Sequence, residues 1–274
     1  MSLYGRRIFA ILLFAGTVSA AVVSANHSWG GYHWARTQNP FTLKTGDNVD
    51  SNWGAYLDEA IADWSLSSVL DLQKVAGGTR SRNCRPTAGR IEVCNAAYGN
   101  NGWLGLAHIW ITGGTHIVQA TTKLNDTYFN TATYDTPAWR RLVTCQELAH
   151  DFGLDHQDEN FSNRNLGTCM DYTSDPDGGG AFGPSNEHPN AHDYEELEII
   201  YAHLDDTTTV GARLPNSAPA AMSDIDLEGP NQWGRLVRSS RNNRVQVYEA
   251  DFGRGHKVVT YVFWADPTAD ARGR

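Results

Sequence analysis

The residues best suited to catalysis in this chain form one short cluster near its middle. Glu147 directly follows Gln146, and His150 comes three residues after Glu147. Residues four apart share one face of a helix, so Gln146 and His150 project side by side, with Glu147 next to them. A reversal of the chain at Gly153 brings His156 back toward the same point. Two imidazoles and a third donor that converge in this way describe a catalytic zinc site, whose fourth position is left to water.

A helix has to hold this cluster, and the flanking residues predict where it begins and ends. Thr136 is suited to cap the first turn, and Pro137 fits the first helical position because its missing N–H costs nothing there. No residue from 137 to 152 breaks a helix, and Gly153 is the residue type that ends one in a left-handed conformation. The face expected to be buried carries Leu142, Cys145, Ala149 and Phe152 at helical spacing.

The segment from Gln146 to His156 resembles the zinc signature of the metzincin metallopeptidases, H-E-x-x-H-x-x-G-x-x-H, with glutamine in place of the first histidine. The resemblance implies one catalytic Zn²⁺ held by His150, His156 and Gln146. It also implies that Glu147 is the general base, which takes a proton from water and passes it to the leaving amine. The expected function is that of a secreted zinc-dependent endopeptidase acting on peptide or protein substrates.

A second segment, Cys169-Met170-Asp171-Tyr172, strengthens the resemblance. It is similar to the metzincin Met-turn, whose methionine lies beneath the metal-binding histidines. Tyr172 matches a tyrosine that approaches the zinc or the transition state in the astacin and serralysin branches. A lone methionine or tyrosine is ordinary core packing, but the distance of this segment from the two histidines favours a Met-turn.

The glutamine at position 146 leaves three alternatives open. Its amide oxygen reaches about as far as a histidine nitrogen, so it is able to bind zinc, although more weakly than imidazole. Alternatively, another histidine completes the site, and His188 and His192 are the nearest downstream. In the third alternative zinc is lost or rarely bound, and the protein is a metzincin-like pseudo-enzyme that holds peptides or protein partners in its cleft.

The beginning of the chain is typical of a secretory signal. Arg6-Arg7 precede an apolar run from Ile8 to Ala25, with small residues before the expected cleavage after Ala25 and a second choice after Ala20. No other stretch could span a membrane, so we expect no stable membrane insertion after cleavage. The 274-residue chain has a net charge of −9, and loss of the two arginines makes it more acidic still. This charge argues against nucleic-acid binding. We expect a secreted, extracellular monomer.

Four cysteines in an exported chain suggest two disulfides. Cys84 and Cys94 flank a short loop and are expected to pair locally. If the Met-turn lies under the active helix, as the resemblance implies, Cys145 and Cys169 are neighbours, and a bridge between them would fasten the floor of the site. The alternative is a cysteine metal ligand, for which Cys145 is poorly placed because its side chain leaves the helix about 100° from that of Gln146.

The order of predicted elements is a strand, a helix, four strands and then the zinc helix. Their ranges are 29–36, 50–64, 68–75, 90–96, 103–111, 116–123 and 137–152. The resemblance to matrix-metalloproteinase-like and astacin-like branches implies an α+β fold with a twisted, mostly parallel five-stranded sheet. It also implies that Leu104-Gly105-Leu106-Ala107 is an exposed edge strand that lines the cleft and pairs with extended substrate. The alternative is one more strand inside the sheet.

The rest of the chain completes the expected domain organisation. The acidic loop from Asp175 to Gly180 is either a weak Ca²⁺ site or a solvated surface loop. A helix from Asn190 to Asp205 would close a catalytic domain of residues 26–205, after a signal peptide of residues 1–25. Residues 206–232 are expected to form a linker, residues 233–266 a small three-stranded β appendage, and residues 267–274 a tail.

Overall fold

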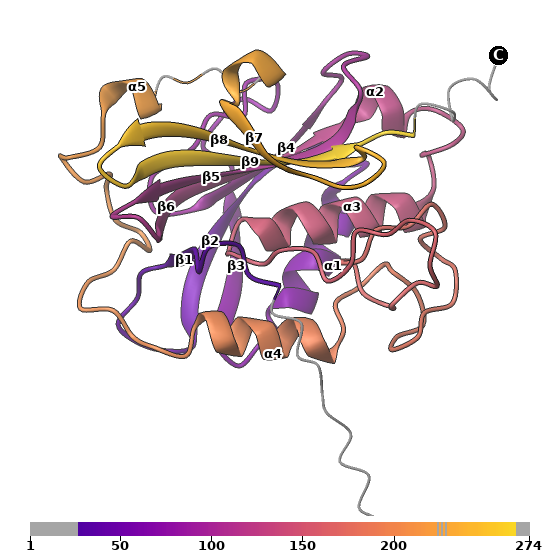
Figure 1. The fold of residues 1–274 in the computed structure, drawn as a ribbon, viewed down its shortest axis with the longest axis horizontal. Coiled ribbons are helices and arrows are strands. Elements are labelled where there is room, and N and C mark those ends of the chain that lie inside the picture. The colour runs from indigo at the N-terminus through magenta and orange to yellow at the C-terminus, as the bar shows by residue number, and fades with distance from the viewer. Residues whose placement is uncertain (1–26, 224, 226, 228, 267–274) are drawn as a thin grey trace, which may run out of the picture.

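The computed structural model describes residues 27–223, 225, 227 and 229–266. The predicted signal segment (residues 1–25) and tail (residues 267–274) lie outside the described residues. The described chain has a mixed α/β fold, in which one large sheet is covered by helices and long loops (Figure 1). Among the described residues, no helix combines the length and the apolar character needed to cross a membrane.

Nine strands form the sheet. Their bounds are β1 His33–Trp34, β2 Phe41–Asn48, β3 Leu70–Ala76, β4 Ile91–Ala96, β5 Trp103–Thr112, β6 His116–Asn125, β7 Arg235–Ser239, β8 Val245–Gly253 and β9 His256–Trp264. The order across the sheet is β3-β2-β4-β6-β5-β9-β8-β7, with β1 paired to β6 beside this path. Strands β1 to β4 and β6 pair in parallel, whereas β5, β9, β8 and β7 pair antiparallel. The part made by β1 to β6 is therefore mostly parallel, as predicted, but the sheet has nine strands in the described residues instead of the five expected, because β2 was missed and β7 to β9 join β5.

Five α-helices and one 3₁₀ turn accompany the sheet in the described residues. Their bounds are α1 Gly54–Trp64, α2 Asp126–Phe129, α3 Pro137–His150, α4 Ala191–Ile200, α5 Ala220–Ser223 and the 3₁₀ turn Pro230–Gln232. Helix α3 starts where predicted, because the Thr136 side chain accepts a hydrogen bond from Trp139 N. It packs against α1, β5, β6 and β9, and it lies beneath the β7–β9 strands in Figure 1. The site helix is thus held between the sheet and α1.

Two differences from the predicted strands occur near the N-terminal end of the described chain. The strand expected over residues 29–36 is reduced to β1, because the backbone N–H groups of Trp34 and Ala35 donate to the side chains of Tyr201 and Thr209 instead of to a neighbouring strand. Strand β2 was not predicted, although its residues alternate between buried and exposed positions. It lies between β3 and β4 and is a central member of the parallel part.

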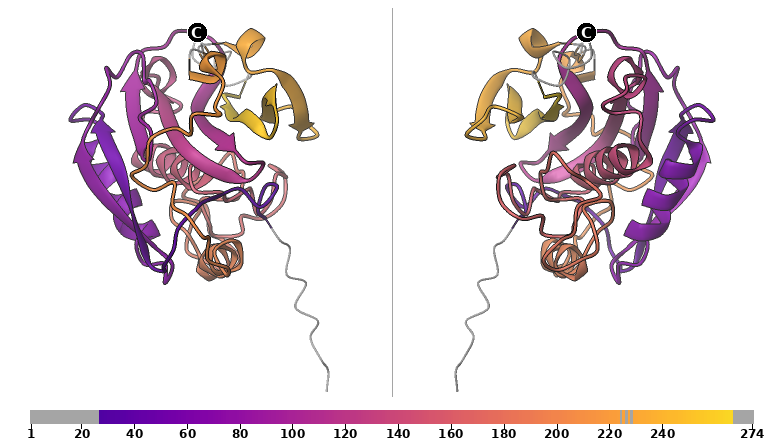
Figure 2. Two further views of the ribbon diagram at one scale, coloured as in Figure 1. Left: turned by 90° about the vertical axis from the view of Figure 1, so that its left-hand side faces the viewer. Right: turned by 90° about the vertical axis from the view of Figure 1, so that its right-hand side faces the viewer.

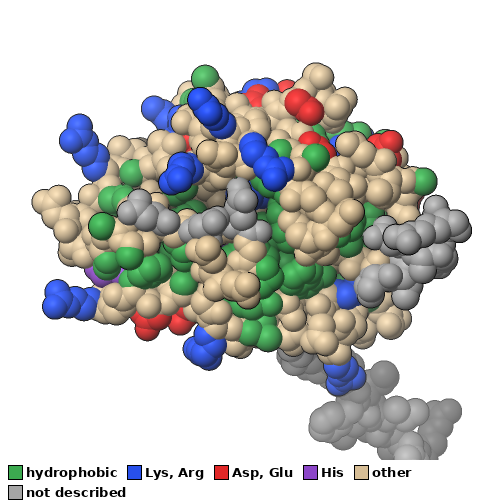
Figure 3. All heavy atoms as spheres, turned by 90° about the horizontal axis from the view of Figure 1, so that it is seen from above, with side chains coloured by type: hydrophobic (Ala, Val, Ile, Leu, Met, Phe, Trp, Pro, Cys, Tyr) green, Lys and Arg blue, Asp and Glu red, His purple; other side chains and the backbone are tan. Residues whose placement is uncertain are grey.

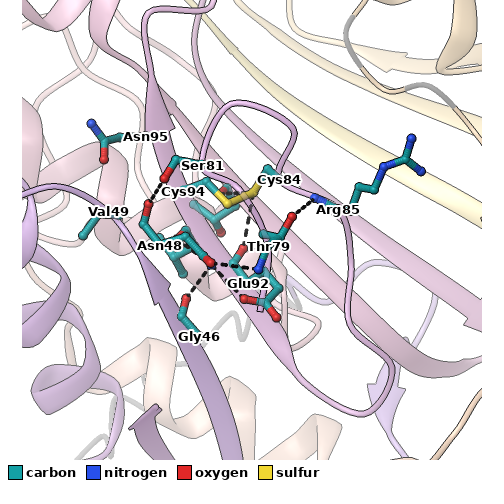
Figure 4. The surroundings of a disulfide bond; sticks show 12 residues. Gly46, Asn48, Val49, Thr79, Ser81, Cys84, Arg85, Glu92, Cys94 and Asn95 are labelled. Carbon is teal, nitrogen blue, oxygen red and sulfur yellow. Dashed lines mark hydrogen bonds between the residues drawn. A yellow bond between two sulfur atoms is a disulfide. The ribbon is translucent and has the colours of Figure 1, made fainter. Parts of the chain in front are cut away.

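The disulfide Cys84–Cys94 fastens the loop between β3 and β4 (Figure 4). Beside it, Asn48 Nδ2 donates to Glu92 Oε2 over 2.7 Å, and Asn48 Oδ1 accepts from Thr79 N over 3.1 Å. The local pairing of these two cysteines is the one expected from their spacing. The loop, β2 and β4 are joined into one rigid corner of the sheet.

The C-terminal strands do not form a separate appendage. Strand β9 pairs along the whole length of β5, so the sheet continues through β9 and β8 to β7. The side views show β8 and β9 (yellow) next to β5 and β6 (magenta), at the opposite end of the molecule from β2 and β3 (Figure 2). The run from Val258 to Phe263 is buried at every position, which suits a strand with two buried faces, and β5 offers it an edge with unpaired backbone groups.

The segment expected to be a linker covers the outer face of this extension. Trp110 Nε1 donates to Met222 O over 2.9 Å, and Trp233 Nε1 donates to Leu227 O over 3.0 Å. These four residues belong to a hydrophobic cluster on the face of β5 and β9 opposite α3. Figure 3 views the molecule from above, where apolar and basic side chains are interspersed around this cover. Both faces of β5 are consequently buried.

Candidate metal centre

The turn after α3 brings the two site histidines together. Gly153 has φ +102°, and Leu154 N donates back to Ala149 O over 3.3 Å, which closes the helix. A Cβ at Gly153 would lie 2.1 Å from Tyr32 O, so glycine is required for space as well as for conformation. The chain reverses here, as the sequence predicts, and His156 returns toward His150 at the helix end.

The rings of His150 and His156 face each other through their Nε2 atoms, which are 2.8 Å apart. His150 Nδ1 donates to Leu154 O over 2.8 Å, and His156 Nδ1 lies 3.1 Å from Glu159 Oε1. With its Nδ1 engaged as a donor, His150 presents the lone pair of Nε2 toward His156. His156 Nδ1 also lies 3.4 Å from Arg238 Nη2, and the tautomer that donates to Glu159 is the one that presents a second lone pair to the same point. Burial lowers the pKa of His156 to about 3, and burial followed by the neighbouring His156 lowers the pKa of His150 well below its usual value. Both rings are therefore neutral and able to bind a cation near pH 7.

Gln146 lies fully buried on the same helix. Its Nε2 donates to Cys169 O over 2.7 Å, and among the described residues its Oε1 has no hydrogen-bond partner. A buried amide oxygen without a partner costs free energy, on the order of 1–3 kcal/mol, unless another group satisfies it. This oxygen is the atom that the sequence analysis assigned to a metal.

Glu147 is buried between α3 and β5. A Cβ at Gly105 would lie 2.7 Å from Glu147 Cγ, so the glycine of β5 makes room for this side chain. Burial, followed by the nearby Asp151 carboxylate, raises the pKa of Glu147 well above its usual value. Within the described residues no hydrogen bond or ion pair joins Glu147 to His150 or His156. The carboxyl group is shielded from solvent, and its raised pKa favours the protonated form.

The segment with Met170 lies under this part of α3. The disulfide Cys145–Cys169 joins it to the helix, and Gln157 N donates to Met170 O over 2.7 Å. Met170 is fully buried, and the ring of Tyr172 lies 4.5 Å from that of His156. The cysteine pairing is the one that the family resemblance implied. The segment holds both the helix and the loop that carries His156.

Strand β9 covers the site, and this overturns one expectation. Gly105 and Ala107 are register partners of Phe263 and Tyr261, so Leu104 to Ala107 lie inside the sheet and are not an exposed edge for substrate. The Tyr261 ring stacks on His150 with centroids 4.1 Å apart and planes 7° from parallel. The sequence from Leu104 to Ala107 predicts a strand. It does not predict that β9 is the neighbour, because alternation within a strand does not specify which strand lies beside it.

Arg238 on β7 is a site residue that the sequence analysis did not single out. Its guanidinium binds Asp155, with Nη1 donating to Oδ2 over 2.6 Å, and it lies 3.0 Å from Glu159 Oε1 and 4.4 Å from the Trp29 ring. Asp155 also accepts from His156 N over 2.8 Å. Arg238 therefore fastens the C-terminal strands to the loop that carries the second histidine. No motif surrounds Arg238 in the sequence to mark this role.

The remaining predicted ligands lie elsewhere. His188 Nδ1 binds Asp63 Oδ2 over 2.7 Å on the side of α1, and His192 pairs with Glu195 at 3.6 Å on α4. In the described part of the chain, neither converges with His150. The loop from Asp175 to Gly180 likewise contributes to neither of the two groups of metal-binding side chains that converge there.

The donors at the centre fit a zinc ion. Two imidazoles whose Nε2 atoms converge are nitrogen donors of the kind that zinc accepts. Gln146 carries an amide oxygen that is unpartnered in the described chain, one helical turn before His150, and amide oxygen is a weaker zinc donor. The 2.8 Å between the two Nε2 atoms is about half an ångström less than the separation of two nitrogens on one tetrahedral zinc. Two lone pairs facing at this distance repel unless a proton or a cation lies between them.

Comparison with known proteins adds little to this geometry. No protein-family model and no curated protein matches the sequence. Among solved structures, a match is high choriolytic enzyme 1, a hatching enzyme zinc-protease from the medaka fish Oryzias latipes, with 12% sequence identity and a TM-score of 0.33. The match covers 62% of this chain and 94% of that chain. At this TM-score we draw no argument from the likeness.

Proposed function

We propose that this protein is a metzincin-like zinc-dependent peptidase whose cleft is closed by its own C-terminal strands. The observation that carries the proposal is the convergence of the Nε2 atoms of His150 and His156, with Glu147 buried on the same helix. An arrangement of two imidazoles and a neighbouring carboxyl group is suited to hydrolysis by an activated water.

In this proposal His150, His156 and the Gln146 oxygen hold zinc. When bound, the ion would polarise the carbonyl group of the substrate and lower the pKa of a water molecule. Glu147 then takes a proton from water at its carboxylate and returns it to the leaving amine. Its raised pKa makes the Glu147 carboxylate a stronger base toward the water. Tyr172 packs on His156, and burial, followed by Glu147, holds the pKa of Tyr172 well above the ordinary value, so the hydroxyl keeps the proton that this proposal has it donate.

A second candidate is a non-catalytic module that binds peptides or proteins, because specific contacts close the histidine centre to a substrate. Strand β9 takes every backbone position on β5 that an extended substrate would use, and Tyr261 lies flat on His150. Access for substrate therefore requires β9 to move. Under the peptidase proposal, a partner, a substrate or a cut in the chain opens this cover.

The test is zinc-dependent cleavage of a degenerate peptide library by the chain from Asn26 onward. We expect slow cleavage by the parent, faster cleavage by Arg238→Gln, which loosens β7, and none by Glu147→Gln in either background. Lys74→Gln is the control, since Lys74 forms an exposed ion pair with Asp58. Silence from both the parent and the Arg238 variant, with folded and zinc-loaded samples, would refute the peptidase. Retention of library peptides on the silent protein would then support the binding module.

A further inference from the structure

Three histidines and one aspartate meet beside β1, away from the centre described above. His33 opens β1 and His116 opens β6, and the two are register partners. His203 and Asp205 follow α4 on the segment that returns to β1, where Asp205 N donates to Arg36 O over 2.9 Å. Distant parts of the chain thus bring His33, His203 and Asp205 to one point, with His116 next to Asp205.

Three of these side chains, His33, His203 and Asp205, offer donor atoms that all lie within 4.8 Å of one another, like the ligands of one ion, and His116 approaches Asp205 beside them. Asp205 Oδ1 lies 3.4 Å from His33 Nε2, 3.3 Å from His116 Nε2 and 3.7 Å from His203 Nε2. His203 Nε2 lies 3.2 Å from His33 Nε2. Four ligands bound tetrahedrally to zinc at about 2.0–2.1 Å are separated from one another by roughly 3.3 Å. The spacing of His33, His203 and Asp205 therefore needs little adjustment to hold an ion, whereas His116 has to turn toward them to become the fourth ligand.

Neighbouring groups orient two of the four donors toward this point. His33 Nδ1 donates to Gly31 O over 2.7 Å, which leaves the lone pair on Nε2 facing the cluster. Asp205 Oδ2 accepts from Arg36 N over 3.1 Å and from Arg36 Nη1 over 2.9 Å, which leaves Oδ1 facing the histidines. A hydrogen bond from the far side of each ligand is the usual support of a protein metal site.

We propose that His33, His116, His203 and Asp205 form a second metal site, which takes a first-row divalent ion and suits Zn²⁺ best. Three imidazoles and one carboxylate are a zinc donor set, and four protein ligands close the coordination sphere, as in structural sites. The side chains of His203 and His116 are 54% and 33% exposed, so an ion enters from solvent on their side. The ion would tie β1, β6 and the segment after α4 together.

This site shares no ligand with the His150–His156 centre, so it does not rest on the proposed function. The ordinary alternative is a hydrogen-bonded cluster, in which protons lie between the imidazoles and Asp205. Such a cluster binds no metal stoichiometrically, and removal of one exposed histidine would leave zinc content unchanged.

The experiment uses the chain from Asn26 onward, stripped with a chelator, reloaded with Zn²⁺ and desalted. Zinc per chain is measured by elemental analysis, and affinity by competition with a chromophoric chelator. The variants are His203→Ala and His116→Ala, both at solvent-facing positions. His188→Ala is the matched control, because His188 is 38% exposed and pairs with carboxylates without a second imidazole. Circular dichroism verifies that each variant is folded.

We expect His203→Ala and His116→Ala each to hold one zinc fewer than the parent, or to bind that zinc at least about tenfold more weakly, whereas His188→Ala matches the parent. If the His150–His156 centre also binds zinc, the parent holds two zinc ions per chain and each of these two variants holds one. If that centre does not bind zinc, the parent holds one and each of these two variants holds none. Equal zinc content and affinity in the parent and in all three variants would overturn the second site, whatever the first site holds.

Discussion

Replacement of Arg238 by glutamine tests whether the C-terminal strands are fastened to the site by charge. In the native protein the guanidinium binds the Asp155 carboxylate, whose side chain is 6% exposed, and also approaches Glu159. Glutamine keeps part of the stem but removes the cation. Asp155 would then retain the hydrogen bond from His156 N, without a positive charge beside it.

The expected cost follows from the burial of the pair. Removal of one partner from a buried ion pair costs roughly 3–5 kcal/mol, and since the Arg238 side chain is 28% exposed we expect the lower end, about 3 kcal/mol. For a chain of this size that corresponds to a fall in Tm of roughly 6–12 °C. Lys74→Gln removes a cation from a pair whose side chains are 39% and 57% exposed, and should cost less than about 1 kcal/mol.

The assay is urea denaturation of Arg238→Gln, Asp155→Asn, the double variant and Lys74→Gln, followed by tryptophan fluorescence. A favourable coupling of about 1–3 kcal/mol between Arg238 and Asp155 is expected from the double-mutant cycle. If Arg238→Gln costs no more than Lys74→Gln, or if the cycle shows no coupling, then charge does not hold the cover and this reasoning is refuted.

Three further predictions concern the site and its floor. Gln146→His should tighten zinc binding on the order of tenfold or more in chelator competition, because imidazole is a better zinc donor than an amide; an unchanged affinity would mean that position 146 does not face the ion. The double variant Cys145→Ala, Cys169→Ala opens a link with a sequence separation of 24 and should lose roughly 3 kcal/mol of unfolding free energy, measured with urea, whereas a loss below 1 kcal/mol would contradict the chain-entropy argument. Burial raises the pKa of Asp171 from 3.8 to about 6. Protonated Asp171 therefore contributes its full share of the unfolding free energy below pH 4, and this contribution is lost as pH rises through 6. Asp171→Asn should flatten the change in unfolding free energy between pH 4 and 7 by about 3 kcal/mol, and an unaltered pH profile would exclude this assignment.

The parts of the fold predicted well are those governed by local chemistry. Thr136 and Pro137 mark the start of α3, and Gly153 marks its end, because caps and left-handed turns depend on residues within one helical turn. The pairing of Cys84 with Cys94 is local in the same sense. Strand β2 carried a usable alternating signal and was missed, so that error lies in the interpretation rather than in the sequence.

What could not be predicted depends on which distant segments meet. The alternation of β9 predicts a strand but not its partner, so the closure of the β5 edge could not be foreseen. His33, His116, His203 and Asp205 have no diagnostic spacing, and only the parallel pairing of β1 with β6 and the return of the chain after α4 bring them together. The same limit applies to Arg238, which meets Asp155 only because the sheet is extended.

The pairing of β9 with β5 also has a consequence for the order of events during folding. His108 on β5 and Thr260 on β9 are joined by a 3.0 Å hydrogen bond across 152 residues of chain. Contacts between such distant residues form late, because the loop-closure entropy has to be overcome first. Helix α3 and the two disulfides use only residues that precede β9 in the chain, so they do not need β9 in order to form. We therefore expect the histidine centre to form first without its cover, and β9 to pair with β5 afterwards. Pulse-labelling hydrogen exchange during refolding checks this order: protection of the β5 amides toward β9 should follow protection of α3, and simultaneous protection would argue against a transient open state.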